Sequence, residues 1–207
     1  MLKKIIVAAA FILSQNAVAQ TFLLEEFTGY DTTAEITITG NGTNTVTFNV
    51  AVTDPAYADI NGVFFNIESG SIASIVGADV TSHGFTNANG TSFGTGSTGV
   101  NINGGGNGGP YDYAVVIGTS GIGTDDINPT SFTVTGAGPI TIGTGFGLRA
   151  TSLDELGNEE NENFRDYSTK LTETGETPPG GNAPAPASAL LMIGAFFGLM
   201  TVRRSKA

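Results

Sequence analysis

The chain has 207 residues, contains neither cysteine nor tryptophan, and carries a formal net charge of −11 at pH 7. This negative field repels nucleic acids and anionic lipid headgroups, so nucleic-acid binding is excluded from the predicted functions. The lack of cysteine excludes a disulfide scaffold and thiolate metal sites, and it leaves the cellular compartment open.

The N-terminus has the three parts of a secretory signal peptide, which we predict for residues 1–19. A basic start with two lysines precedes an apolar run at residues 5–13, and Ala17-Val18-Ala19 provides the small side chains that signal peptidase requires. The apolar run is too short to span a bilayer, which takes about 20 residues. We expect cleavage after Ala19, so that Gln20 becomes the first residue of the mature protein.

Runs of alternating apolar and polar residues predict β-strands in the central part of the chain. The clearest strand is expected at residues 45–53, where every second residue is apolar and would share one face. In the run at residues 111–117, Ala114 and Val116 fill the second face as well, which suggests that both faces are partly covered. Further strands are expected at residues 35–39, 63–68, 132–134, 140–142 and 146–148. No run in the mature domain has convincing helical spacing.

Turn residues separate these runs. Asn41-Gly42 favours a type I′ hairpin between the first two strands, because both residues tolerate positive φ, and Asp54-Pro55 ends the second strand, because proline cannot donate to a ladder. Residues 86–110 consist mainly of Gly, Asn, Ser and Thr and predict long loops around one weak strand. Together these patterns predict an all-β fold, with a single β-sandwich (jelly-roll-like) domain at residues 20–172 between a signal helix and a C-terminal transmembrane helix.

Two polar segments follow the predicted strands. Residues 154–166 carry six acidic side chains in thirteen positions, which predicts a solvated loop, and they lack the D-x-[DN]-x-[DN]-G spacing of a calcium loop. Residues 173–186 contain four prolines and three glycines without apolar periodicity, which is typical of an extended linker.

Calcium is the only cofactor for which the sequence offers candidate ligands. Asp125 with Asp126, and Asp54 with Asp59, are the best candidates, because a hard cation binds clustered carboxylates in loops. A plain capped turn is the alternative for either pair. If the chain had a Ser-His-Asp triad, its base would have to be His83, because this is the only histidine. No G-x-S-x-G motif accompanies it, so we predict an exposed loop histidine and no catalytic residue.

The C-terminal residues 187–207 have the pattern of a membrane-spanning tail. Residues 187–202 contain no charge, and Arg203 and Arg204 follow at once as the expected stop. The positive-inside rule would leave these arginines in the cytoplasm and the acidic domain outside. Removal of the basic residues in the signal peptide and tail leaves 3 basic and 19 acidic residues, so the exported part carries a net charge of −16.

The tail resembles the PEP-CTERM sorting signal of Gram-negative bacteria, which combines a short proline motif, a hydrophobic helix and a terminal arginine cluster. The motif here is Pro184-Ala185-Pro186, in which Ala185 stands where the family usually has glutamate. Residues 59–67 (DINGVFFNI) and Thr169-Lys170-Leu171 are similar to motifs of domains that often carry this tail. The resemblance implies export, processing by an exosortase-like transpeptidase, and residence at the cell surface or in the extracellular matrix.

These observations predict a non-enzymatic surface or extracellular (biofilm) matrix protein. It would be anchored in the inner membrane by its C-terminal helix during processing, and would then reach the cell surface or the medium. Its expected partners are signal peptidase, the exosortase-like transpeptidase and an exopolysaccharide. A carbohydrate- or calcium-binding surface module is the first alternative. A hydrolase is the second, because paired carboxylates for glycoside hydrolysis leave no fixed sequence spacing.

Overall fold

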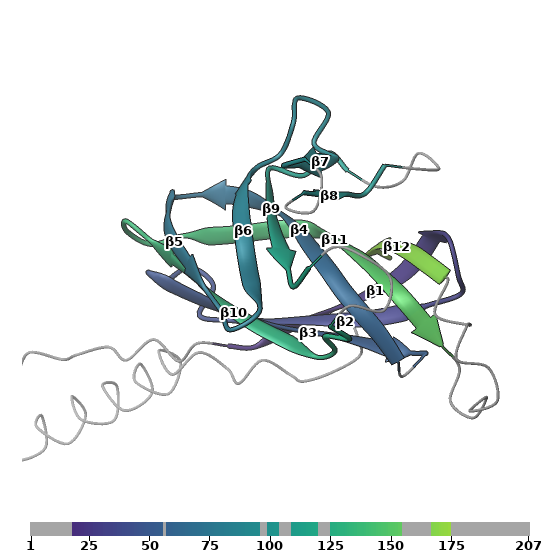
Figure 1. Cartoon of the computed structure of the whole chain (residues 1–207). Coiled ribbons are helices and arrows are strands. Elements are labelled where there is room, and N and C mark those ends of the chain that lie inside the picture. Colours follow the sequence, from purple (N-terminus) through teal and green to yellow (C-terminus); the bar gives the residue numbers. More distant parts are fainter. Residues whose placement is uncertain are drawn as a thin grey trace, which may run out of the picture.

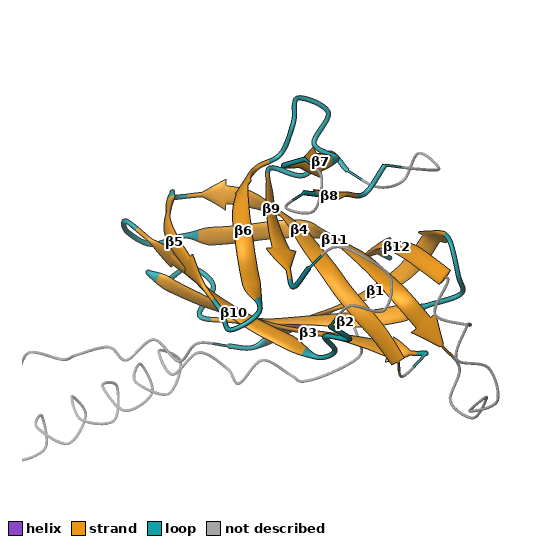
Figure 2. Cartoon of the chain, viewed as in Figure 1, coloured by secondary structure: helices purple, strands orange, loops and turns teal. Residues whose placement is uncertain are grey.

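Figure 1 shows the computed structural model of the chain, which is built from β-strands. The structure describes residues 18–55, 57–95, 99–103, 109–119, 125–154 and 167–174. Within these ranges the chain forms strands, turns and loops and no helix, which confirms the predicted all-β class (Figure 2). Accordingly, the described part of the chain has no helix long and apolar enough to cross a membrane.

The strands vary in length from two to fourteen residues. In chain order they are β1 (Gln20–Thr28), β2 (Thr33–Thr39), β3 (Thr45–Asp54), β4 (Tyr57–Ser69), β5 (Ile72–Val76), β6 (Val80–Phe85), β7 (Ser92–Phe93), β8 (Val100–Asn101), β9 (Tyr113–Ile117), β10 (Thr130–Gly136), β11 (Thr141–Asp154) and β12 (Tyr167–Glu173).

Ten strands form one antiparallel sheet in the order β5-β10-β3-β2-β1-β12-β11-β4-β9-β6, and β7 pairs with β8 in a separate ribbon. The first and last strands of this order, β5 and β6, are neighbours in the chain, so the sheet curls until it is nearly closed. In the β-sandwich that the sequence predicted, two separately hydrogen-bonded sheets would pack face to face. Here the halves are continuous, because β1 pairs with β2 on one side and with β12 on the other (Figure 1).

The main core lies between the two halves of the curled sheet. The alternation in β3 places Val46, Phe48, Val50 and Val52 inside, as predicted, and all four are buried. Phe48 stacks on Phe132 of β10 with 4.7 Å between ring centroids, and it also contacts Phe65 of β4 at 5.1 Å. Aromatic packing therefore joins strands from both halves, and burial of these large side chains is a major source of stability.

A second, smaller core covers the outer face of β4 and β9. The segment that contains β7 and β8 folds over this face, which explains why Ala114 and Val116 are buried although they point away from the main core. The second core consists of Phe64, Val100, Ile102, Tyr111, Ala114 and Val116. The prediction that both faces of this strand are partly covered is confirmed. In the described part of the glycine-rich segment there are two very short strands, where one weak strand was predicted.

The turn between β2 and β3 differs from the predicted type I′ turn. The hairpin itself is present, but positive φ occurs at Gly40 and Gly42 and not at Asn41. The Asn41 side chain instead binds both backbone groups of Ile142, with the Ile142 N–H donating to Oδ1 at 2.7 Å and Nδ2 donating to the Ile142 carbonyl at 3.0 Å. This amide bridges β11 and the β2–β3 turn, and the bridge is a tertiary contact that local turn preferences do not encode.

Candidate functional site

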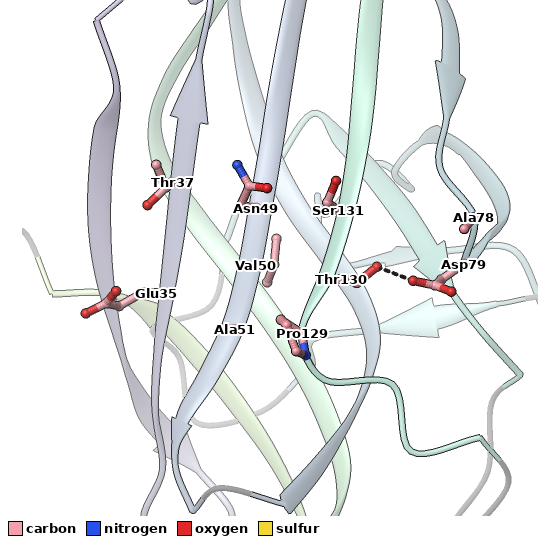
Figure 3. Close-up of a pocket in the computed structure, with 10 residues that line it drawn as sticks. All are labelled: Glu35, Thr37, Asn49, Val50, Ala51, Ala78, Asp79, Pro129, Thr130 and Ser131. Carbon is pink, nitrogen blue, oxygen red and sulfur yellow. Dashed lines mark hydrogen bonds between the residues drawn. The ribbon is translucent and has the colours of Figure 1, made fainter.

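A groove of about 420 Å³ lies on the outer face of β2, β3 and β10 (Figure 3). This volume is within the range of about 300–1,000 Å³ that is usual for small-molecule sites. Six of its ten lining residues are polar, and apolar atoms form the larger part of its exposed surface. The lining residues are Glu35, Thr37, Asn49, Val50, Ala51, Ala78, Asp79, Pro129, Thr130 and Ser131.

The strand register places three polar side chains of the groove in one row. Thr37 of β2 pairs with Asn49 of β3, and Asn49 pairs with Ser131 of β10. The same row extends to Thr21 of β1, whose hydroxyl lies 2.8 Å from the Thr37 hydroxyl. Figure 3 shows Thr37, Asn49 and Ser131 at one level on adjacent strands. Because strands lie about 4.8 Å apart, the row presents a polar group at regular intervals across the sheet.

One wall of the groove is the turn between β5 and β6. Thr130 donates its hydroxyl hydrogen to Asp79 Oδ2 at 2.8 Å, and the Gly118 N–H donates to the Asp79 carbonyl at 2.7 Å. A Cβ atom on Gly77 would lie only 2.8 Å from the Ser131 carbonyl oxygen. Glycine at position 77 therefore lets the turn approach β10 closely, and the two hydrogen bonds hold Asp79 beside the groove.

The side chains that line the groove are either negatively charged or uncharged. Glu35 and Asp79 supply its two carboxylates, and its lining contains no basic side chain. The only lysine and arginine in the described ranges, Lys170 and Arg149, lie on β12 and β11, which are separated from β2 by β1. Pro129 adds exposed apolar surface to the hydroxyl and amide groups. The arrangement is suited to binding a polar uncharged molecule.

A buried carboxylate, Asp59, lies on β4 and fastens the segment that precedes β10. The Ile127 N–H donates to Asp59 Oδ1 at 3.2 Å, and Asn61 Nδ2 donates to Oδ2 at 3.0 Å. The Thr151 hydroxyl donates to Asn61 Oδ1 at 2.8 Å and completes a buried chain of polar groups. Burial raises the pKa of Asp59 from 3.8 to about 6, and the negative charge of Asp125 adds to this increase.

The predicted calcium ligands are grouped differently from the two sequence pairs. Asp125 and Asp126 are exposed, and both lie near enough to Asp59 for their charges to raise its pKa. Asp54 instead pairs with Thr33 at the end of β3 and is not among the charges that act on Asp59. Asp125 Oδ2 accepts a hydrogen bond from the Thr119 N–H at 2.7 Å. In the described ranges, no three histidine or acidic side chains are grouped closely enough to hold a metal ion.

His83 does not lie in an exposed loop, and that prediction was wrong. It belongs to β6, pairs with Val115 of β9 and is half-buried. Its Nδ1 lies 2.9 Å from the Tyr113 hydroxyl, so its polar contact is with a phenol. The run around His83 lacks apolar alternation because β6 is the last strand of the sheet and is only partly buried.

Of the predicted processing sites, Ala19 and Gln20 belong to the described residues. Ala19 is exposed and precedes the first strand, and Gln20 is the first residue of β1. Ala17, the sorting motif Pro184-Ala185-Pro186, and the stop residues Arg203 and Arg204 lie outside the described residues.

The groove itself was not predicted from the sequence. Alternation predicts that Thr37 and Asn49 point outwards, but it does not say that β10 pairs with β3, some 80 residues away in the chain. The chain matches no family model, no curated protein and no solved structure.

Proposed function

We propose that the chain is an exported, non-enzymatic protein of the cell surface or extracellular matrix. Its domain would be released from the signal peptide by signal peptidase and sorted through the PEP-CTERM-like tail. In this proposal the domain is flanked by a signal helix and a single membrane helix, both of which belong to segments outside the described residues.

The position of the folded domain between the two processing signals carries this proposal. Cleavage after Ala19 would leave β1 complete, because β1 begins at Gln20. At the other end, β12 ends at Glu173, where the proline- and glycine-rich linker begins. Both expected cuts would therefore spare every strand of the described residues, as required of a protein that works after processing.

The contacts of two polar side chains, the half-buried His83 and the buried Asp59, support a non-enzymatic function. His83 contacts Tyr113, and Asp59 is held by the backbone of Ile127 and by Asn61. Each of these contacts is explained by the fold, and neither His83 nor Asp59 lines the groove. A carbohydrate-binding module is the second candidate function, and the groove over β2, β3 and β10 is the observation that favours it.

Cell fractionation of the full-length chain tests the proposal, with a variant that lacks residues 187–207 as the matched control. The full-length protein is expected on the surface or in the matrix. The shortened variant is expected in the periplasm, because its signal peptide still directs export but its sorting tail is missing. Cytoplasmic full-length protein, or identical distributions of the two forms, would contradict the proposal.

A further inference from the structure

We propose that the groove over β2, β3 and β10 binds a neutral glycan that lies across the strands, with Thr37, Asn49 and Ser131 as successive contacts to its hydroxyl groups. This inference rests on the second candidate function, the carbohydrate-binding module, and it does not depend on how the tail is processed.

The direction of the glycan follows from the spacing of the polar groups. Thr37, Asn49 and Ser131 occupy three neighbouring strands in register, so their separation is the strand spacing of about 4.8 Å. This distance is comparable with the length of one sugar ring. Successive outward residues on a single strand are farther apart, at about 6.6–6.8 Å. A chain of sugars therefore matches the row across the strands better than it matches any single strand.

The row has hydrogen-bonding groups that are available to a ligand. Asn49 and Ser131 are exposed, and neither side chain is engaged by another described residue. Thr37 shares a hydrogen bond with Thr21, which leaves part of its capacity, since a hydroxyl has one donor and two acceptor positions. Amide and hydroxyl side chains both donate and accept, as sugar hydroxyl groups do. The groove therefore offers complementary partners on three adjacent strands.

The groove also offers surface for the C–H groups of a sugar ring. Ala51, Ala78 and Pro129 contribute apolar atoms between the polar side chains, and Ala78 and Pro129 are exposed. The row and the wall are held before binding, by the β2–β3–β10 ladder and by the hydrogen bond from Thr130 to Asp79. A preformed site of this kind loses little conformational entropy when a ligand binds.

Charge determines which sugars fit. Glu35 and Asp79 line the groove and no cation lines it, so a uronate or sulfate group would face two carboxylates. Juxtaposed like charges are strongly unfavourable at an interface. The net charge of −16 on the exported part acts in the same direction at longer range. The site should therefore accept neutral glycans and reject acidic ones.

Affinity electrophoresis of the full-length protein in neutral detergent tests the inference. The gels contain dextran, galactomannan or mixed-linkage β-glucan as neutral polysaccharides, or alginate as the acidic one. We expect retardation by at least one neutral polysaccharide and none by alginate. The variant N49A/S131A should weaken that retardation at least tenfold. The matched control T45A/T135A changes an outward-facing pair on the same two strands outside the groove, and it should bind as the parent does.

Three results would overturn the inference. They are retardation by none of the neutral polysaccharides, retardation by alginate alone, and equal loss of binding in the groove variant and in the control variant. Thermal unfolding of each variant shows that it is folded before binding is compared. A protein that is correctly sorted in the fractionation experiment but fails to bind would refute this inference and leave the proposed surface function intact.

Discussion

The buried carboxylate of Asp59 accepts a hydrogen bond from the backbone N–H of Ile127, with 3.2 Å between Oδ1 and N. The next residue of β4, Ile60, donates its own N–H to the Ile127 carbonyl at 2.9 Å. These two bonds fasten the segment before β10 to β4, so that the start of a groove strand is tied to the opposite half of the sheet. Asp59 is fully buried there, and its ionisation therefore affects stability.

Asp59 should make the protein less stable as the pH rises from about 4 to about 6. Burial raises the pKa of Asp59 to about 6, whereas the carboxyl group of the unfolded chain has a pKa near 3.8. The folded state therefore holds more protons than the unfolded state in this window, and the free energy of unfolding falls with pH. The expected loss is on the order of 2 kcal/mol, measured by urea unfolding between pH 4 and pH 7.

The variant D59N isolates this effect from that of the other carboxylates. Because it has no charge to lose, the difference in unfolding free energy between D59N and the parent should shift in favour of D59N as the pH rises. Parallel pH profiles for the two proteins would show that Asp59 does not titrate differently in the folded state.

Calcium is expected to leave the melting temperature unchanged. The carboxylates of Asp59 and Asp125 already accept hydrogen bonds from backbone N–H groups of Ile127 and Thr119. A bound ion would compete with these contacts for the carboxylate oxygens, and a ligand raises stability only when it binds the folded state more tightly than the unfolded state. Thermal unfolding in millimolar calcium is compared with unfolding in EDTA and in magnesium. A calcium-specific rise of several degrees that disappears in D125N would instead favour the calcium-binding alternative.

An atom added beneath the second core should lower the free energy of unfolding, because the space there is already filled. A Cβ atom on Gly147 would lie 2.5 Å from Ile102 Cδ1 and 2.8 Å from Tyr111 Cζ, so G147A is expected to cost about 1–3 kcal/mol of unfolding free energy. Gly143, on the same strand, has no neighbour closer than 3.7 Å to an added Cβ, and G143A should change stability by less than about 0.5 kcal/mol. Equal effects in urea unfolding would argue against close packing of the β7–β8 segment on β11.

Arg149 and Lys170 should repel each other across the sheet. They are directly opposite on β11 and β12, and burial together with the Arg149 charge lowers the pKa of Lys170. Like charges in this position are unfavourable by about 0.2–1 kcal/mol. A double-mutant cycle with R149Q and K170Q, measured by urea unfolding, should give an unfavourable coupling energy that becomes smaller in 1 M NaCl because salt screens the charges. A favourable coupling energy would refute the repulsion.

The sequence predicted those strands whose alternation is regular. In β3 and β10 every second side chain is buried, so the pattern and the structure agree residue by residue. β1 was missed because Phe22, Leu23 and Leu24 are consecutive apolar residues without alternation. Apart from Ile140, the predicted runs at 140–142 and 146–148 belong to one strand, β11. Its pairing with β4 is interrupted by bulges that local patterns do not reveal.

The functional surface was harder to predict than the strands. Its outward residues follow from alternation, but the groove requires β10 beside β3 and the β5–β6 turn beside β10. These are non-local pairings, and periodicity along one strand contains no information about its neighbours. The carboxylates of Asp59 and Asp125 were predicted in separate pairs for the same reason. Their proximity depends on the hydrogen bond between Asp59 and Ile127.

Sorting through the tail can be tested by the intact mass of the protein from its own cells, with membrane, surface and medium fractions analysed separately. We expect a surface or medium form that begins at Gln20 and ends near residues 183–187, so that β1 to β12 are complete. A mature form found only in the membrane that retains Arg203 and Arg204 would contradict tail-directed sorting and would make the tail a permanent single-span anchor.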